Sequence, residues 1–223
     1  PRALDVRTTG VHATGELYPL SGSLSGLGLG FVAEKALTVS HDVPAADAVS
    51  GASASASQLR WGVGLRYRQP LGAAGTALTA GLGYNELVFA MDRQVTLPPA
   101  MAGTPDTHYR YLDPSLSLHQ PLAAHTALVA TVRAWLFLDA GAIVQHEEYG
   151  QADLTGFDAE LALEYTLAAR YPLRAGARYG VIGYDFVGDG ERARADDGDR
   201  STLDIGGARD RYLACALTAG YLW

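Results

Sequence analysis

The ten residues LRWGVGLRYR, from Leu59 to Arg68, decide the fold. Two kinds of residue alternate along them: Leu59, Trp61, Val63, Leu65 and Tyr67 form one set, and Arg60, Gly62, Gly64, Arg66 and Arg68 form the other. A period of two is typical of a β-strand, because successive side chains point to opposite faces. Residues 157–167 and 173–181 show the same alternation. The pattern predicts strands with one apolar face and one charged or small face.

A short motif of Pro-Leu preceded by Tyr or Gln recurs at a constant spacing. It stands at Tyr18-Pro19-Leu20, Gln69-Pro70-Leu71, Gln120-Pro121-Leu122 and Tyr171-Pro172-Leu173, so its first residues are 18, 69, 120 and 171. A step of 51 residues fits two strands, a tight turn and a longer loop. Because Pro has no amide hydrogen and presets φ for a turn, we expect these sites to be equivalent turns on one rim.

The strands that this repeat implies run alternately toward and away from the Pro-Leu rim. Those running toward it are 6–17, 59–68, 109–119, 157–170 and 212–223, and those leaving it are 24–39, 76–89, 126–143 and 173–186. Antiparallel closure normally requires an even number of strands. Either a first strand precedes Pro1, which makes ten, or residues 1–20 are a lead-in and there are eight. We favour ten, because the repeat already includes Tyr18.

No run of 18 apolar residues occurs, so a helical span is excluded and a closed barrel is the only other way to cross a membrane. Three features favour a membrane barrel over a soluble one: the loops, the aromatic residues and the end of the chain. Long polar segments at 40–57, 93–107 and 188–202 face short turns, as in outer-membrane barrels. Aromatic residues predict two girdles around an apolar band: Tyr18, Tyr67, Tyr171, Tyr221 and Trp223 at the Pro-Leu rim, and Tyr109, Tyr111, Tyr184, Phe186 and Tyr212 at the other. The prediction is a single all-β domain, 1–223, folded as a transmembrane antiparallel up-and-down β-barrel.

The end of the chain carries a more specific pattern. Leu217, Ala219, Tyr221 and Trp223 alternate, and the chain stops on the aromatic residue. This resembles the closing strand of small bacterial outer-membrane β-barrels, in which such residues are the signal read by the barrel insertion machinery. The resemblance implies a location in the outer membrane of a Gram-negative bacterium, with membrane lipid and lipopolysaccharide against the apolar face.

Charges of both signs fall on the inward-facing positions. They are Arg60, Arg66, Arg68, Arg133, Asp158, Glu160, Glu164, Arg174 and Arg178. The interior of a barrel of eight to ten strands is narrow enough for side chains to fill. We therefore expect this lumen charge network to plug the barrel, with Glu164 paired to Arg174 or Arg178. A narrow charged pore is the alternative interpretation of the same residues.

A few histidines and acidic residues are candidates for catalysis or metal binding. His41 beside Asp42, His108, and His146 beside Glu147 and Glu148 lie near the long-loop rim. They leave open a lipid-modifying or proteolytic enzyme there, but we predict no catalytic, cofactor or metal site. His119 and His125 at the Pro-Leu rim are expected to be solvated, and the acidic segment 185–200 lacks an EF-hand pattern. Gly26, Gly28 and Gly30 are expected to face the lumen, and lone Cys215 to face lipid.

The charge of the chain bears on its partners. A net charge of −7 argues against nucleic acid, because phosphate binding requires a basic face. We predict a non-enzymatic membrane anchor or scaffold of an envelope complex, with periplasmic or membrane proteins as partners. A small porin-like channel is the first alternative, and the rim enzyme is the second.

Overall fold

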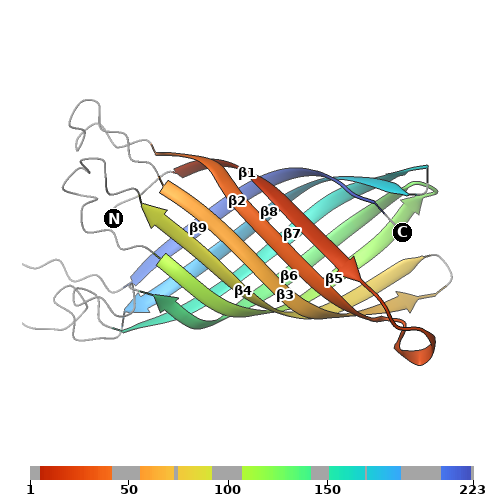
Figure 1. Ribbon diagram of the computed structural model, residues 1–223, viewed down its shortest axis with the longest axis horizontal. Coiled ribbons are helices and arrows are strands. Elements are labelled where there is room, and N and C mark those ends of the chain that lie inside the picture. Colours follow the sequence, from red (N-terminus) through yellow and green to blue (C-terminus); the bar gives the residue numbers. More distant parts are fainter. Residues whose placement is uncertain are drawn as a thin grey trace, which may run out of the picture.

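The computed structural model describes residues 6–41, 56–72, 75–91, 107–141, 151–168, 170–186 and 207–221. They form a single antiparallel sheet of nine strands in which each strand pairs with the next along the sequence (Figure 1). The strands are β1 Val6–Leu17, β2 Leu27–His41, β3 Ala56–Leu71, β4 Thr76–Met91, β5 Thr107–Ala123, β6 Thr126–Gly141, β7 Ala152–Leu167, β8 Tyr171–Phe186 and β9 Gly207–Ala219, with a 3-10 turn η1 at Gly22–Leu24. The fold is therefore all-β and up-and-down.

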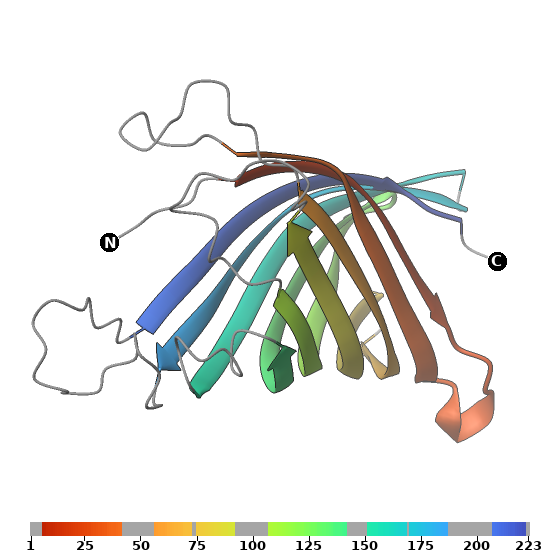
Figure 2. The same ribbon diagram turned by 60° about the vertical axis from the view of Figure 1, so that its left-hand side comes forward.

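The sheet curls around a central axis into a nearly closed barrel (Figures 1 and 2). We call the end where residues 18–26, 72–75, 124–125 and 168–170 connect the strands the turn rim, and the opposite end the loop rim. Most residues of the predicted long polar segments 40–57, 93–107 and 188–202 lie outside the described ranges. Among the described residues, no helix is long and apolar enough to cross a membrane.

The two edge strands, β1 and β9, bound a seam. Both run toward the turn rim, and no ladder between them occurs within the described residues. The eight-strand alternative is wrong, since Val6–Leu17 is a strand paired along its length with β2. A further strand before Pro1 stays a prediction.

The faces of the sheet are inverted relative to a water-soluble barrel. In β3, Trp61, Leu65 and Tyr67 point outward and are exposed, whereas Arg60 points inward and is 4% exposed. Leu217 on β9 is 82% exposed. Soluble proteins rarely expose contiguous apolar surface of this extent. The structure thus places apolar side chains on the outer surface and polar ones in the lumen.

Glycines in the lumen make room for larger polar neighbours. A Cβ on Gly83 would lie 2.1 Å from Asp113 Oδ1, and one on Gly62 would lie 2.4 Å from Asn85 Oδ1. Gly28 and Gly30 are also buried in the lumen face of β2, as predicted for the glycine-rich segment. Gly62 in LRWGVGLRYR therefore makes room for Asn85 of β4, and Gly83 of β4 makes room for Asp113 of β5.

The Pro-Leu motifs all lie at the turn rim, but the prediction that they are equivalent turns is wrong. Pro70 and Pro121 lie near the ends of β3 and β5, where they pair with Ala77 and Ala127, and Pro172 lies at the start of β8. Pro is tolerated at strand ends because few ladder donors are lost there. The turns themselves use other residues: Gly72 and Gly75 adopt φ of 74° and 75°, and Ala168 has φ of 48°.

Candidate functional site

The lumen holds most of the charged residues that the sequence singled out. Arg60 and Arg66 come from β3, Arg133 from β6, Asp158 and Glu160 from β7, and Arg174 and Arg178 from β8, all on inward positions. The alternation of each strand aims these side chains at the barrel axis. The structure joins them into ion pairs, with further partners that sequence reasoning missed.

The central network is built on Asp158, whose side chain is completely buried. Arg133 Nη1 lies 2.7 Å from Asp158 Oδ1, and Trp135 Nε1 donates to Asp158 Oδ2 at 3.0 Å. Arg133 Nη2 also lies 3.2 Å from Glu160 Oε2, and Arg174 Nη2 lies 2.6 Å from Glu160 Oε1. Two arginines and two carboxylates from three adjacent strands therefore satisfy one another inside the barrel.

A second buried group lies on the neighbouring strands. Arg60 Nη2 donates to Asn85 Oδ1 at 3.2 Å and lies 4.0 Å from Asp113 Oδ2. All three residues are nearly inaccessible, with Asn85 at 1% exposure. Asn85 on β4 and Asp113 on β5 lie on inward-facing positions, as Arg60 does on β3. The alternation of inward and outward residues along β4 and β5 was therefore the signal that could have identified them.

The predicted pairing of Glu164 is wrong. Arg174 is its cross-strand neighbour but extends instead to Glu160, because Gly176 and Ala162 leave the intervening lumen position nearly empty. Glu164 Oε1 instead lies 3.6 Å from His119 Nε2.

Arg178, the other residue predicted to pair with Glu164, reaches across the seam. Arg178 Nη2 on β8 lies 3.8 Å from Glu34 Oε2 on β2, so it links strands on the two sides of the gap. At the turn rim, Arg66 Nε lies 3.9 Å from Glu16 Oε1. Arg68 is exposed there and has no ion pair among the described residues.

Aromatic rings cross the lumen between the charged groups. Tyr111 stacks on Trp135 with ring centroids 5.0 Å apart, and Trp135 stacks on Tyr212 at 5.7 Å. Arg60 lies 6.0 Å from the Tyr111 ring centroid, and Arg178 lies 5.4 Å from that of Tyr212. We call these five residues the cation–aromatic stack. Because they come from β3, β5, β6, β8 and β9, the stack joins opposite walls of the barrel.

The predicted aromatic girdle at the loop rim is wrong. Tyr109, Tyr111, Tyr184 and Phe186 are buried in the lumen, together with the half-buried Tyr212. The Tyr109 and Tyr184 hydroxyls are hydrogen-bonded, and Tyr184 also donates to Asp210 Oδ2 at 2.6 Å. These positions share the strand phase of the lumen charges, so the alternation itself contradicts an outward girdle.

The girdle predicted at the turn rim is confirmed for three of its residues, whereas Tyr18 is half-buried and its ring lies against Gly28 of the lumen face. Tyr67, Tyr171 and Tyr221 are exposed there, and the rings of Tyr171 and Tyr221 are in contact. Of the predicted insertion signal, Leu217 and Ala219 lie on exposed positions of β9, Tyr221 follows it, and Trp223 lies outside the described residues.

Tyr18 follows β1 at the turn rim and bonds to the end of that strand. Its hydroxyl donates to Glu16 Oε2 at 2.8 Å. Partial burial, followed by the charge of Glu16, raises the pKa of Tyr18 to about 12. The phenol therefore stays protonated and continues to donate at any physiological pH.

A polar cluster on the outer surface contains one of the histidine candidates. Glu86 accepts from Tyr84 at 2.8 Å and from Trp61 at 3.2 Å, and it lies 3.3 Å from Arg110 Nε. His108 Nε2 lies 3.7 Å from Glu86 Oε2. Asp42, His146, Glu147, Glu148 and the side chain of His41 lie outside the described residues, as do residues 187–200 of the acidic segment. The absence of a catalytic site stays a prediction, and the rim enzyme stays the second alternative.

Neither a metal site nor a similar known protein was found for the described chain. Within the described ranges, no group of three or more His, Cys, Asp or Glu residues is placed to hold a metal ion. Comparison of the chain with protein-family models, curated proteins and solved structures found no match.

Proposed function

We propose that the chain spans the outer membrane of a Gram-negative bacterium as a non-conducting β-barrel that anchors or scaffolds an envelope complex. The inverted sheet supports this proposal. Apolar side chains such as Leu161 and Leu217 cover the outer surface, and buried charges line the lumen. In hydrocarbon, contact with lipid lowers the free energy of this arrangement. In water the same arrangement would leave most of the apolar residues exposed to solvent.

The height of the apolar surface fits a membrane. On β7 the outward residues from Phe157 to Leu167 are apolar throughout, and Thr155 and Asp153 continue the same face toward the loop rim. This apolar run measures about 33 Å along the strand and roughly 25 Å along the normal at a tilt of ~40°. We refer to it as the apolar band. An outward band of this height is typical of outer-membrane barrels.

The observation that supports a non-conducting lumen is the cation–aromatic stack. Tyr111, Trp135 and Tyr212 stack in series across the lumen, with Arg60 and Arg178 at the ends. The ion pairs of Arg133 and Arg174 occupy the same interior. Side chains held both by rings and by ion pairs leave little room for a permeating ion.

The proposal is tested on full-length protein purified in detergent. A folded barrel should migrate differently on a gel before and after boiling, and it should partition with outer-membrane vesicles. A chain that shows no shift and stays in solution without detergent would contradict the membrane location. The same sample gives the conductance measurement, in which we expect no steady openings.

A narrow pore is the second candidate, and buried polar atoms in the lumen favour it. The hydroxyls of Tyr111 and Tyr212 and Arg178 Nε have no hydrogen-bond partner among the described residues. Polar atoms of this kind can line a thin path for water. Steady single-channel openings from a heat-shifted sample would favour the pore over the plugged anchor.

A further inference from the structure

A hollow on the outer surface lies where the apolar band meets the loop rim. It measures about 440 Å³ and is formed by β7, β8 and β9, with Thr155, Phe157, Val181, Gly183, Arg209 and Arg211 among its walls. The ladder explains its shape: Thr155 pairs with Gly183, and Gly183 pairs with Arg209. Because Gly183 has no side chain, the space between Thr155 and Arg209 stays open.

The hollow carries two positive charges that form no ion pair within the part of the chain that the structure describes. Arg209 and Arg211 are exposed on the outward face of β9, and within the described residues no carboxylate forms an ion pair with either. The intervening Asp210 points inward to Tyr184. By contrast, Arg110 on the same outer face is paired with Glu86 and Asp139. Arginine facing lipid is costly unless it lies at the interface or meets an anion.

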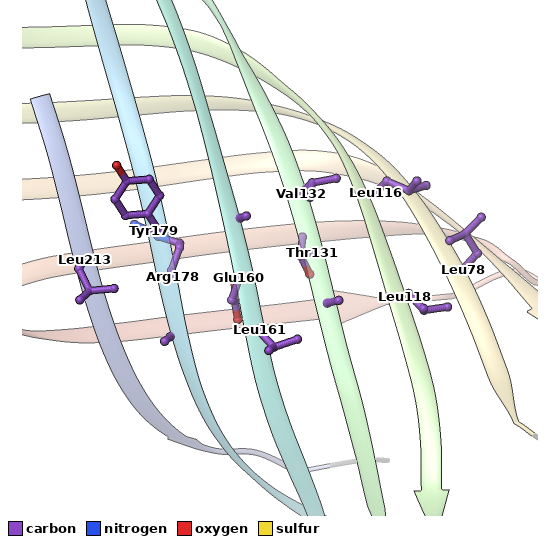
Figure 3. A pocket seen from close by; sticks show the side chains of 13 residues that line it. Leu78, Leu116, Leu118, Thr131, Val132, Glu160, Leu161, Arg178, Tyr179 and Leu213 are labelled. Atoms are coloured by element: carbon purple, nitrogen blue, oxygen red, sulfur yellow. The ribbon is translucent and has the colours of Figure 1, made fainter. Parts of the chain in front are cut away.

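The surroundings define where an anion would lie. Asp153 and Asp185 stand one row nearer the loop rim on the same face, so carboxylates border the hollow above the arginines. Below, Tyr179 also lines a second, apolar hollow of about 560 Å³. Figure 3 shows Leu213 on the strand beside Tyr179, with Val132 and Leu116 farther along the same outer surface on other strands. A ligand with an anionic head and apolar chains matches this order.

We propose that Arg209 and Arg211 bind a phosphate group of a glycolipid in the loop-rim leaflet, with its acyl chains lying over Tyr179 and the apolar hollow beside it. This site rests on the membrane location proposed above. Guanidinium groups form paired hydrogen bonds with phosphate oxygens, and the Thr155 hydroxyl adds a neutral donor. In a Gram-negative outer membrane the lipid of that leaflet with phosphate on its headgroup is lipopolysaccharide.

The test is a titration of the full-length protein in detergent with lipid A carrying both phosphates, followed by native mass spectrometry. Changing both Arg209 and Arg211 to Gln should weaken binding about tenfold, since charge-assisted hydrogen bonds are lost. Changing both to Lys keeps the charge and should retain most of the binding. The matched control removes two positive charges elsewhere, by Lys35→Gln with Arg170→Gln, and should bind as the wild type does.

Each outcome has a defined meaning. Lipid A without phosphates should bind the wild type weakly, and inorganic phosphate should not displace the phosphorylated lipid at equal concentration. Equal binding by the Gln variant, or displacement by inorganic phosphate, would overturn the lipid site. Heat-shift gels on the same samples keep the two proposals apart: a shifted barrel with unchanged lipid binding contradicts only this site, and a wild type without a shift contradicts the membrane location as well.

Discussion

Asp158 illustrates how much of the interior depends on one residue. Its carboxylate accepts from Arg133 and from Trp135, so the same side chain holds the ion-pair network and orients the central ring of the cation–aromatic stack. The sequence singled out Asp158 from the strand alternation alone. Its partner Trp135 was missed, although the odd-numbered residues 127–137 of β6 share the inward phase of Arg133.

Removing this carboxylate should be costly. Asp158→Ala leaves Arg133 with only Glu160 and leaves the Trp135 indole without an acceptor, so we expect a loss of about 3 to 5 kcal/mol in the free energy of unfolding. Denaturant unfolding in detergent measures it. Glu164→Gln is the control, because Glu164 is partly exposed and its ion-pair partner is His119. Equal stability of Asp158→Ala and wild type would contradict the network.

Gly180 is the residue on which the end of the stack rests. Gly180 is the cross-strand neighbour of Tyr212, and the Tyr212 ring lies over it. A Cβ on Gly180 would therefore lie 2.0 Å from Tyr212 Cζ. Gly180→Val should displace the ring from Trp135 and change the Trp135 fluorescence, measured with Trp61 and Trp223 both replaced by Phe. Gly183→Ala on the outward face of the same strand meets only Thr155 Oγ1 at 3.3 Å and should leave the emission unchanged. Unchanged emission in Gly180→Val would show that Tyr212 does not depend on this contact.

The strands themselves could be predicted well, because period-two alternation is a local property of the sequence. Val6–Leu17 was obtained with its bounds, and the other strands within a few residues. Two features were misjudged. The aromatic residues at the loop rim were assigned by their nearness to strand ends rather than by phase. The Pro-Leu repeat was taken for turns, whereas the turn positions depend on residues such as Gly72 and Ala168.

The partners of the lumen charges could not be read from the strands. Which of two inward carboxylates an arginine reaches depends on the space left by its neighbours, as Arg174 shows by passing over Gly176 to Glu160. The Arg178 contact with Glu34 depends on the closure of the barrel, which joins residues far apart in the chain.

On the outward face of β7, the effect of a charged substitution on the free energy of unfolding should depend on depth in the membrane. Leu161 lies in the middle of the apolar band, and Asp153 lies outside it near the loop rim. Leu161→Arg should lower the free energy of unfolding in lipid vesicles by about 2 to 4 kcal/mol, whereas Asp153→Arg should change it by about 0 to 1 kcal/mol. If the two variants unfold alike, the outer surface is not in contact with hydrocarbon.

At the scale of the whole molecule, the seam is the unusual feature. β1 and β9 run in the same direction, and their outer edges carry backbone groups that no strand in the described part of the chain pairs. In hydrocarbon such groups must be satisfied. One additional strand lying antiparallel to both would satisfy them, and such a strand is what the ten-strand prediction requires.

Cys215 allows the seam to be tested, because it lies on the outward face of β9. A strand in the seam would keep β1 and β9 about 9.6 Å apart, beyond the ~7 Å limit for a disulfide. We therefore expect no disulfide to Cys215 when a single cysteine is placed at Val11, Ala13 or Gly15 in the full-length protein. Ala177→Cys, at the cross-strand neighbour of Cys215, should form one. A disulfide between Cys215 and any of the β1 positions would mean that the barrel closes directly with nine strands.

We propose that the barrel crosses a membrane with its lumen blocked by the cation–aromatic stack. The most direct measurement compares, in planar bilayers, the heat-shifted wild type with a variant in which Tyr111, Trp135 and Tyr212 are all Ala. We expect no steady openings for the wild type and stable openings for the variant, because in the variant the rings that join opposite walls are gone. Steady openings of the wild type, equal to those of the variant, would contradict it.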